Sequence, residues 1–245
     1  MKRCVAVLAA LACVALVPAT EADNSQTGNH QQELGSYSDT PFPAASCPAD
    51  CQAMAQVTGV QMQIGSHHSP FRVKRPGNIV AFTIRLANPS ADQINYFKTT
   101  FGAKKTPRDG LTPGGDDAQV RLSVLKPLHT KQRFLLENQS ETFDVEQYLG
   151  STVTFALAKA LRIHKDRLLA LTVPTWVPAF AHSLDTNEAW RASHRSDECT
   201  QKNPHPRPHT KMGTFMQYGC FYRTARVLYS ATFVPDAAKT SPPAK

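Results

Sequence analysis

Lysine and arginine are absent between Asp23 and Phe71, although the 245-residue chain contains 27 of them and carries a formal net charge of +8. Large apolar side chains are also scarce in the first part of this stretch, residues 23–45. Such a segment buries too little apolar surface to offset the entropy that is lost on ordering. We therefore expect residues 23–45 to form a disordered leader and residues 236–245, which have a similar composition, to form a disordered tail.

No stretch of the sequence offers the roughly 20 apolar residues that a membrane-spanning helix needs. The longest apolar run, from Cys4 to Val17, follows a basic pair at positions 2 and 3, and small residues come after it at Ala19 and Ala22. This pattern is typical of a secretory signal peptide, cleaved after one of those two alanines. Lipidation at Cys13 is the alternative, but alanine stands where such a site usually has leucine. We expect residues 1–22 to be a signal peptide and the mature protein to be secreted, without a transmembrane segment.

Short catalytic motifs are missing as well: the sequence has no G-x-S-x-G elbow, no H-E-x-x-H zinc motif and no glycine-rich phosphate loop. His182, Ser183 and Asp185 are close in sequence, but catalytic triads are assembled from separate elements, so their adjacency says little. The pair Asp116–Asp117 lies in a loop-like segment, where a solvated loop or half of a calcium site is the simpler interpretation. We expect no cofactor and no catalysis, and a hydrolase of unknown specificity is the alternative.

Four cysteines remain once the signal peptide is removed, namely Cys47, Cys51, Cys199 and Cys220. An even number of cysteines in an exported chain predicts disulfides, and four of them allow three connectivities. Two local bridges, one within each sequence pair, are the favoured arrangement. A bridge from the early pair to the late pair is the alternative that the sequence leaves open.

Zinc binding is a competing interpretation of the late cysteine pair. Cys199, His205, His209 and Cys220 could supply two thiolates and two imidazoles to a tetrahedral zinc ion. An oxidising compartment favours a disulfide between the two thiols, and the prolines at positions 204, 206 and 208 keep the histidines from sharing a helical face. We therefore expect no bound metal.

Apolar and polar residues alternate with a period of two in five segments, which are residues 80–86, 119–124, 152–157, 169–173 and 227–233. Weaker candidates are residues 58–64, 134–137 and 142–148. Such alternation places one face of a strand on the core and the other toward water, so Arg121 is expected to face solvent. The pattern predicts an all-β fold, an antiparallel sandwich of the jelly-roll type, over residues 46–235. Its expected core residues are Phe82, Ile84, Leu122, Val124, Phe155, Leu171 and Phe233.

One helix interrupts the strands. The sequence from Ser90 to Gln93 has the form of a capping box, and apolar side chains then recur on one face as far as Phe101. Gly102 suits the position that ends a helix. Long loops are expected on either side of the later strands, at residues 103–118 and 176–216, where binding function would most often lie.

Four segments carry a resemblance to known proteins, namely residues 77–82, 119–125, 169–176 and 219–226. Together they resemble uncharacterised exported bacterial proteins with a jelly-roll sandwich domain, and more distantly the galactose-binding-like sandwiches of secreted enzymes. The resemblance covers roughly residues 47–235. It implies the fold, and it assigns a role to no residue.

Aromatic residues in the irregular regions are the remaining clue to function. Trp176, Trp190, Tyr218 and Tyr222 are candidate binding residues, because a ring on a rigid loop suits contact with a sugar or a partner surface. The alternative is that these rings close the ends of the core. We expect an exported binding or surface-associated module whose partner is a polysaccharide or another cell-envelope polymer. A structural envelope protein is a further alternative, and nucleic acid is not expected because the basic residues are scattered.

Overall fold

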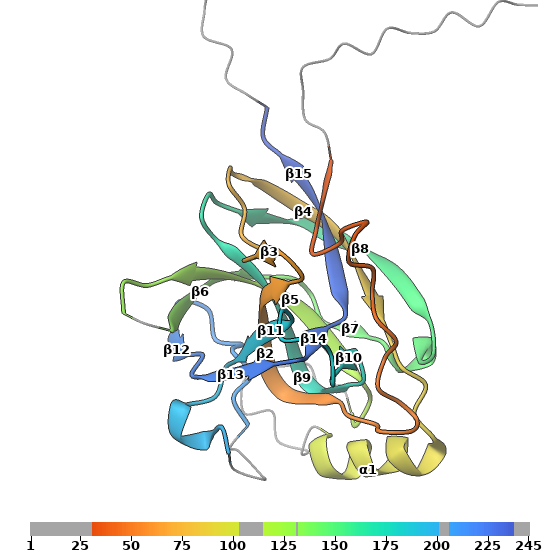
Figure 1. The fold of residues 1–245 in the computed structure, drawn as a ribbon. Coiled ribbons are helices and arrows are strands. Elements are labelled where there is room, and N and C mark those ends of the chain that lie inside the picture. Colours follow the sequence, from red (N-terminus) through yellow and green to blue (C-terminus); the bar gives the residue numbers. More distant parts are fainter. Residues whose placement is uncertain (1–30, 103–114, 131, 201–205, 238–245) are drawn as a thin grey trace, which may run out of the picture.

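The structure is a computed structural model that describes residues 31–102, 115–130, 132–200 and 206–237 (Figure 1). Strands make up most of it, every pair of neighbouring strands runs antiparallel, and the described ranges hold one α-helix. The predicted all-β sandwich with one short helix is therefore confirmed. No helix in these ranges is long and apolar enough to cross a membrane.

Two curled sheets form the sandwich. The smaller sheet has the strand order β1 (Gln32–Leu34), β15 (Tyr229–Pro235), β4 (Gly77–Arg85) and β8 (Thr152–Ile163). The larger sheet has the order β12 (Phe215–Gln217), β6 (Arg133–Gln139), β5 (Gln119–Pro127), β9 (Leu168–Val177), β2 (Met54–Ile64), β11 (Ala189–Ala192) and β13 (Cys220–Arg223). In addition, β3 (His67–His68) pairs with β2, β7 (Phe143–Asp144) pairs with β5, and β10 (Phe180–Ala181) pairs with β14 (Arg226–Val227).

The core between the sheets contains the side chains that the alternation predicts. Six of the seven expected core residues are at most 1% exposed, namely Phe82, Ile84, Leu122, Val124, Leu171 and Phe233. The seventh, Phe155, is half-buried because β8 is an edge strand, and its ring lies 5.3 Å from the Phe82 ring between centroids. The inward face was therefore predicted correctly for the five strands that carry these residues, β4, β5, β8, β9 and β15.

The outward face of the larger sheet is also covered, and here the sequence prediction is wrong. Residues 206–219, called the return segment below, cross this face and bond to it. The His209 amide donates to Thr58 Oγ1 at 2.9 Å, and the Tyr218 amide donates to the Gln132 carbonyl at 2.7 Å. Arg121, expected to face water, is 8% exposed, and burial lowers its pKa. The sheet therefore has a second, smaller apolar cluster on its outer side, which includes Val60, Leu125, Phe134, Leu136, Leu168, Ala170 and Tyr218.

The expected disordered leader is wrong for residues 31–45. Strand β1 pairs with β15, with Gln32 opposite Phe233. Tyr37 stacks on His67 at 3.7 Å between ring centroids, and the carbonyls of Thr40 and Pro41 accept hydrogen bonds from Arg226. Contacts with β15, His67 and Arg226 thus order residues 31–45, although the composition of this segment alone predicts disorder. Residues 23–30 lie outside the described residues.

The expected tail also begins later than the sequence suggested. Asp236 accepts two hydrogen bonds from Arg162, each at 2.6 Å, and its amide donates to the Pro76 carbonyl at 3.0 Å. The ordered domain therefore extends to at least this residue, and residues 238–245 lie outside the described ranges.

Helix α1 (Ala91–Phe101) begins with the predicted capping box. The Gln93 amide donates to Ser90 Oγ at 3.3 Å, and the Ser90 amide donates to Gln93 Oε1 at 2.8 Å. Lys98 fixes the helix to the sandwich, since its ammonium group lies 2.9 Å from Asp117 and 2.6 Å from Glu146. Gly102 follows the helix with φ −57°, so it does not adopt the left-handed conformation typical of a terminating glycine.

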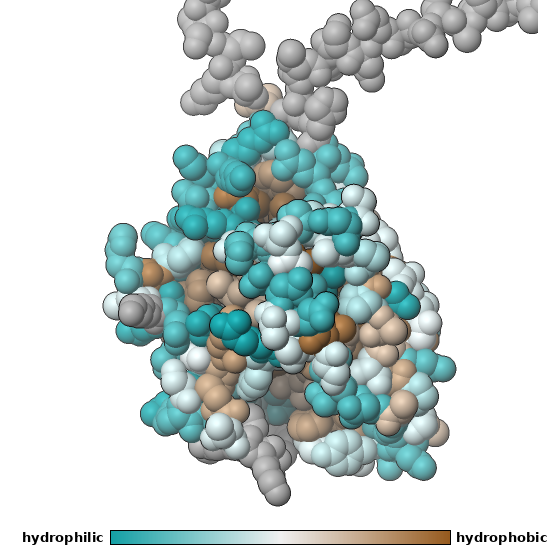
Figure 2. Space-filling model, viewed as in Figure 1, coloured by the Kyte–Doolittle hydropathy of each residue, from teal (hydrophilic) through white to brown (hydrophobic). Residues whose placement is uncertain are grey.

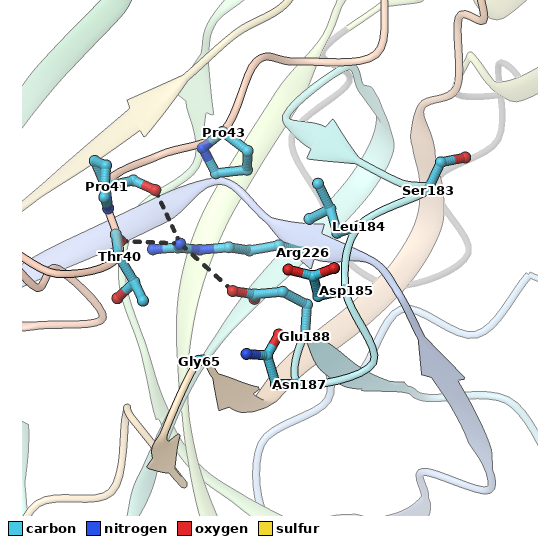
Figure 3. Close-up of a pocket in the computed structure, with 10 residues that line it drawn as sticks. All are labelled: Thr40, Pro41, Pro43, Gly65, Ser183, Leu184, Asp185, Asn187, Glu188 and Arg226. Atoms are coloured by element: carbon cyan, nitrogen blue, oxygen red, sulfur yellow. Dashed lines mark hydrogen bonds and ion pairs between the residues drawn. The ribbon is translucent and has the colours of Figure 1, made fainter.

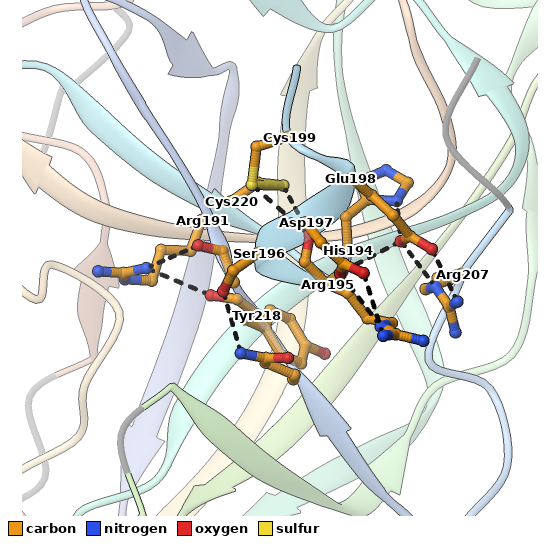
Figure 4. The surroundings of a disulfide bond; sticks show 12 residues. Arg191, His194, Arg195, Ser196, Asp197, Glu198, Cys199, Arg207, Tyr218 and Cys220 are labelled. Atoms are coloured by element: carbon orange, nitrogen blue, oxygen red, sulfur yellow. Dashed lines mark hydrogen bonds and ion pairs between the residues drawn. A yellow bond between two sulfur atoms is a disulfide. The ribbon is translucent and has the colours of Figure 1, made fainter. Parts of the chain in front are cut away.

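Both favoured disulfides are present, Cys47–Cys51 and Cys199–Cys220. The second closes the loop that contains the return segment, beside the short helix η2 (Ser196–Glu198) (Figure 4). Its sulfurs are bonded to each other, so the four-ligand zinc alternative is wrong. His209 is buried, with its Nδ1 hydrogen-bonded to the Tyr218 hydroxyl and its Nε2 to the Thr214 carbonyl. His205 lies outside the described residues.

Candidate binding cleft

A cleft of about 710 Å³ opens at one end of the sandwich, where α1, the start of β2 and the strands β11 and β13 meet. Its volume lies within the range of about 300–1,000 Å³ that is typical of small-ligand sites. Figure 2 shows a hollow at the end of the molecule near α1, bordered by apolar side chains. The described residues that line the cleft are residues 52–57, Tyr96, Thr100, Phe101, Phe180, His182, Trp190, Ala192, His194, Pro206 and residues 222–225.

Aromatic rings form the apolar part of the lining. Trp190 and Tyr222 are opposite each other in the pairing of β11 with β13, and their ring centroids are 5.0 Å apart. Phe180, on β10, meets the Trp190 ring edge to face at 5.7 Å. Three strands thus fix the three rings at their positions. Trp190 and Phe180 are only 7% and 8% exposed, so most of each ring packs in the core and the half-buried Tyr222 offers the larger aromatic surface to the cleft.

A backbone irregularity shapes the opposite wall. Gln56 has φ 46° at a register shift between β2 and β9, and it turns its side chain out of the sheet. Its side-chain nitrogen Nε2 donates to the Phe101 carbonyl at the end of α1, and its backbone carbonyl accepts from the Arg207 backbone amide at 2.9 Å. Gln56 therefore connects the helix and the return segment across the cleft.

The aromatic surface has two polar groups, the Trp190 indole nitrogen and the Tyr222 hydroxyl. Trp190 Nε1 is buried and has no hydrogen-bond partner within the described residues. Burial raises the pKa of the Tyr222 hydroxyl, which is protonated at neutral pH even at its ordinary pKa of about 10. Because Trp190 Nε1 is enclosed by protein, the Tyr222 hydroxyl is the donor that a ligand in the cleft can reach.

The charged groups near the cleft are arranged asymmetrically. His194 is a buried residue of the lining, and its Nδ1 is 4.0 Å from Glu198 Oε2. Two hydrogen bonds from the Arg207 guanidinium, at 2.8 and 2.9 Å, hold the pKa of Glu198 at about 2 (Figure 4). Glu198 is thus engaged behind the cleft. No Asp or Glu is among the described residues of the lining, which does contain Arg223, so its charge favours neutral or anionic ligands.

Comparison of the chain with protein-family models, curated proteins and solved structures finds no match. The resemblance to exported bacterial sandwich proteins stays a prediction.

Two of the four predicted binding aromatics line the cleft, Trp190 and Tyr222. The other two are fully buried, and for them the alternative of core packing holds. Trp176 packs on Phe97 of α1 at 5.2 Å and donates to the Asp116 carbonyl at 2.8 Å. Tyr218 belongs to the return segment, and its ring meets Phe134 edge to face.

Sequence reasoning missed several members of the cleft. Tyr96 is 57% exposed, yet in the sequence it is only one more aromatic residue within α1. Phe180 and His182 were visible as residues of an irregular segment that follows β9. No local signal could place them beside Trp190, because the pairing of β10 with β14 brings them there.

A second cavity, of about 400 Å³, surrounds Arg226 (Figure 3). Arg226 is 1% exposed and crosses the cavity, where its Nη1 lies 3.9 Å from Glu188 Oε1. Asp185, Asn187 and Leu184 come from the loop that precedes β11, and Thr40, Pro41 and Pro43 from the N-terminal segment. This site is called the Arg226 cavity below.

Between the aromatic cleft and the Arg226 cavity, His182 contacts Ser183 and an aspartate. The aspartate is Asp50, whereas Asp185 is the one that lies close to them in sequence. His182 Nδ1 lies 3.0 Å from Ser183 Oγ, and its Nε2 lies 3.4 Å from Asp50 Oδ2. The Asp50 side chain is 77% exposed, so solvent screens its effect on the imidazole. Asp185 instead lines the Arg226 cavity.

Proposed function

We propose that this protein is an exported binding protein without catalytic activity, and that a polysaccharide or related cell-envelope polymer occupies the aromatic cleft. The aromatic surface made by Trp190, Tyr222 and Phe180 carries the proposal. A sugar ring has an apolar face and polar edges, and this surface offers aromatic rings with one donor, the Tyr222 hydroxyl, at its margin. The two disulfides support export, because such bonds form in oxidising compartments.

The charge of the lining narrows the class of polymer. The described lining residues include no carboxylate, and the chain as a whole has a formal net charge of +8. Long-range attraction therefore favours polymers that carry carboxylate or phosphate groups over basic ones. A neutral glycan remains compatible with the aromatic surface itself.

Tryptophan fluorescence tests the proposal directly, because the chain has two tryptophans and one of them lines the cleft. A glycan array with mature protein selects the strongest oligosaccharide, which is then titrated while fluorescence is recorded. Binding should change the emission of the wild type and of Trp176→Phe, whose remaining tryptophan is Trp190. Trp190→Phe should lose the signal and bind about 3- to 10-fold more weakly, as expected for a smaller aromatic contact.

Phe215→Ala is the matched control, since Phe215 is 53% exposed on β12 and does not line the cleft. It should bind like the wild type. Equal affinity of Trp190→Phe and wild type, or failure of every glycan to bind, would refute the proposal. The second result would favour a structural role in the envelope.

A hydrolase is the second candidate, and the contact of His182 with Ser183 and Asp50 is the observation that favours it. The same oligosaccharide should be analysed for shortened products after incubation with wild type and with Ser183→Ala. Release of products by the wild type but not by Ser183→Ala would replace binding by catalysis as the function.

A further inference from the structure

The Arg226 cavity contains a carboxylate that the fold leaves incompletely bonded. Glu188 is 8% exposed, and its Oε2 has no hydrogen-bond partner within the described residues. Its Oε1 lies 3.9 Å from Arg226 Nη1, which is an ion pair without a short hydrogen bond. A buried carboxylate oxygen without a hydrogen-bond donor destabilises a fold, so binding of a ligand that supplies a donor here would be favoured.

Arg226 cannot supply that donor, because its terminal nitrogens are already engaged. Nη1 donates to the carbonyls of Thr40 and Pro41 at 3.1 and 3.2 Å, and Nη2 donates to the Gly35 carbonyl at 3.2 Å. Figure 3 shows the guanidinium directed toward this N-terminal segment, with Glu188 to one side. The remaining nitrogen, Nε, is buried and has no acceptor within the described residues. The cavity thus presents one unsatisfied acceptor and one unsatisfied donor.

The charge of the cavity favours a cation. Asp185 and Glu188 both line it, and Arg226 is the basic residue among the described lining. Burial raises the pKa of Glu188 and the nearby Asp185 adds to this, while Arg226 and the Gly65 amide lower it. A positive group placed between the two carboxylates relieves both the repulsion and the loss of solvation.

An organic cation fits this cavity better than a metal ion does. Within the described ranges, no three His, Cys, Asp or Glu side chains come together in a way that could hold a metal. The volume of about 400 Å³ is that of a small-molecule site, and Pro41, Pro43 and Leu184 provide an apolar wall for a carbon skeleton.

We propose that the Arg226 cavity binds a small organic ammonium ion that carries a hydroxyl group, such as an amino sugar. The ammonium group pairs with the carboxylates of Glu188 and Asp185, and a hydroxyl oxygen lies beside the Arg226 guanidinium. The site is separate from the aromatic cleft, and the proposal does not depend on the ligand of that cleft.

Isothermal titration calorimetry at pH 7.5 with three probes tests the chemistry. Glucosamine carries both groups, glucose lacks the ammonium group, and n-butylammonium lacks the hydroxyls. Glucosamine should bind most tightly and glucose at least about 10-fold more weakly, as expected when a charged hydrogen bond is lost. Glucose binding as tightly as glucosamine would overturn the proposal, and so would calcium chloride binding in place of both amines.

Variants then locate the site. Glu188→Gln keeps the shape of the side chain, and should weaken glucosamine binding about 10-fold or more. Asp185→Asn alters an exposed residue, so it tests the site without risk to the core, and a loss of about 2- to 5-fold is expected because solvent screens its charge. Asp166→Asn is the matched control, since Asp166 pairs with Arg72 away from the cavity, and it should bind like the wild type.

Trp190→Phe separates this proposal from the proposed function, because that variant should bind glucosamine in the Arg226 cavity as the wild type does. Unchanged affinity in both Glu188→Gln and Asp185→Asn would place the amine elsewhere and refute the site.

Discussion

Removing the Cys199–Cys220 disulfide should destabilise the protein more than removing Cys47–Cys51, by an amount that follows from chain length. The bridges join residues 21 and 4 positions apart. The entropy lost by closing such loops in the unfolded chain corresponds to ~3.3 kcal/mol for the long loop and ~1.9 kcal/mol for the short one. Replacing both cysteines of a pair by serine should lower the free energy of unfolding by about these amounts.

The structure adds a local effect to the longer loop. The return segment lies within it and covers the outer face of the larger sheet, including Leu125, Phe134 and Leu136. In the Cys199→Ser/Cys220→Ser variant, this segment should open before the sandwich unfolds. Amide hydrogen exchange of Tyr218, whose amide bonds to the Gln132 carbonyl, should therefore become faster than that of the core strands.

Urea denaturation of the two double variants, followed by circular dichroism, measures the difference. The expected result is a lower midpoint for the Cys199→Ser/Cys220→Ser variant, with the Cys47→Ser/Cys51→Ser variant closer to the wild type. Equal losses, or a larger loss in the second variant, would show that the return segment stays in place without its bridge and would refute the reasoning.

Acidification should destabilise the protein in two separate steps. Burial lowers the pKa of His209, so below its ordinary pKa of about 6.5 the unfolded chain binds a proton more readily, and the free energy of unfolding falls between about pH 7 and pH 5. His209→Gln should flatten that slope in urea titrations at the two pH values, and an unchanged slope would argue against it. Glu198, with a pKa of about 2, stabilises the fold fully above about pH 4.5 and loses this effect as the pH falls toward 2. Glu198→Gln should therefore lower the free energy of unfolding above about pH 4.5 and remove its fall toward pH 2. Arg121→Asp should lower the free energy of unfolding by about 3 kcal/mol or more, because it buries a carboxylate beside Gln139 and Thr142. The control is Arg75→Asp at an exposed position, which should change the free energy of unfolding by less than about 0.5 kcal/mol. Similar urea midpoints for the two variants would show that Arg121 is not buried.

The inner half of the fold follows from the sequence, because an inward side chain repeats at every second position of a strand. Leu122 and Val124 illustrate this, and so does the capping box at Ser90, where the signal and its effect lie within four residues. The outer face of the larger sheet could not be predicted in this way. Arg121 and Ser123 are polar residues that alternate with apolar ones, yet both are buried. Arg121 donates to Gln139 and Thr142, and Ser123 bonds to Thr172 on the neighbouring strand.

The candidate sites depend still more on distant contacts. Trp190 and Tyr222 could be named as aromatics of irregular segments, but their closeness arises from the pairing of β11 with β13. Arg226 and Glu188 gave no signal at all, since one charged residue in a strand and one in a loop are common in any sequence. Only the ordered N-terminal segment, whose carbonyls surround Arg226, turns them into the lining of a cavity.

The pairing of β1 with β15 sets the stage of synthesis at which this domain can close. Gln32 lies opposite Phe233, and Thr232 donates to Glu33 across 199 positions of sequence. The smaller sheet therefore lacks β15, and with it the pairing of β1, until nearly the whole ordered chain is available. Contacts of such long range form slowly, because the loop between them must first be closed. A chain of this design therefore completes its smaller sheet late, after nearly all of the ordered residues have been synthesised.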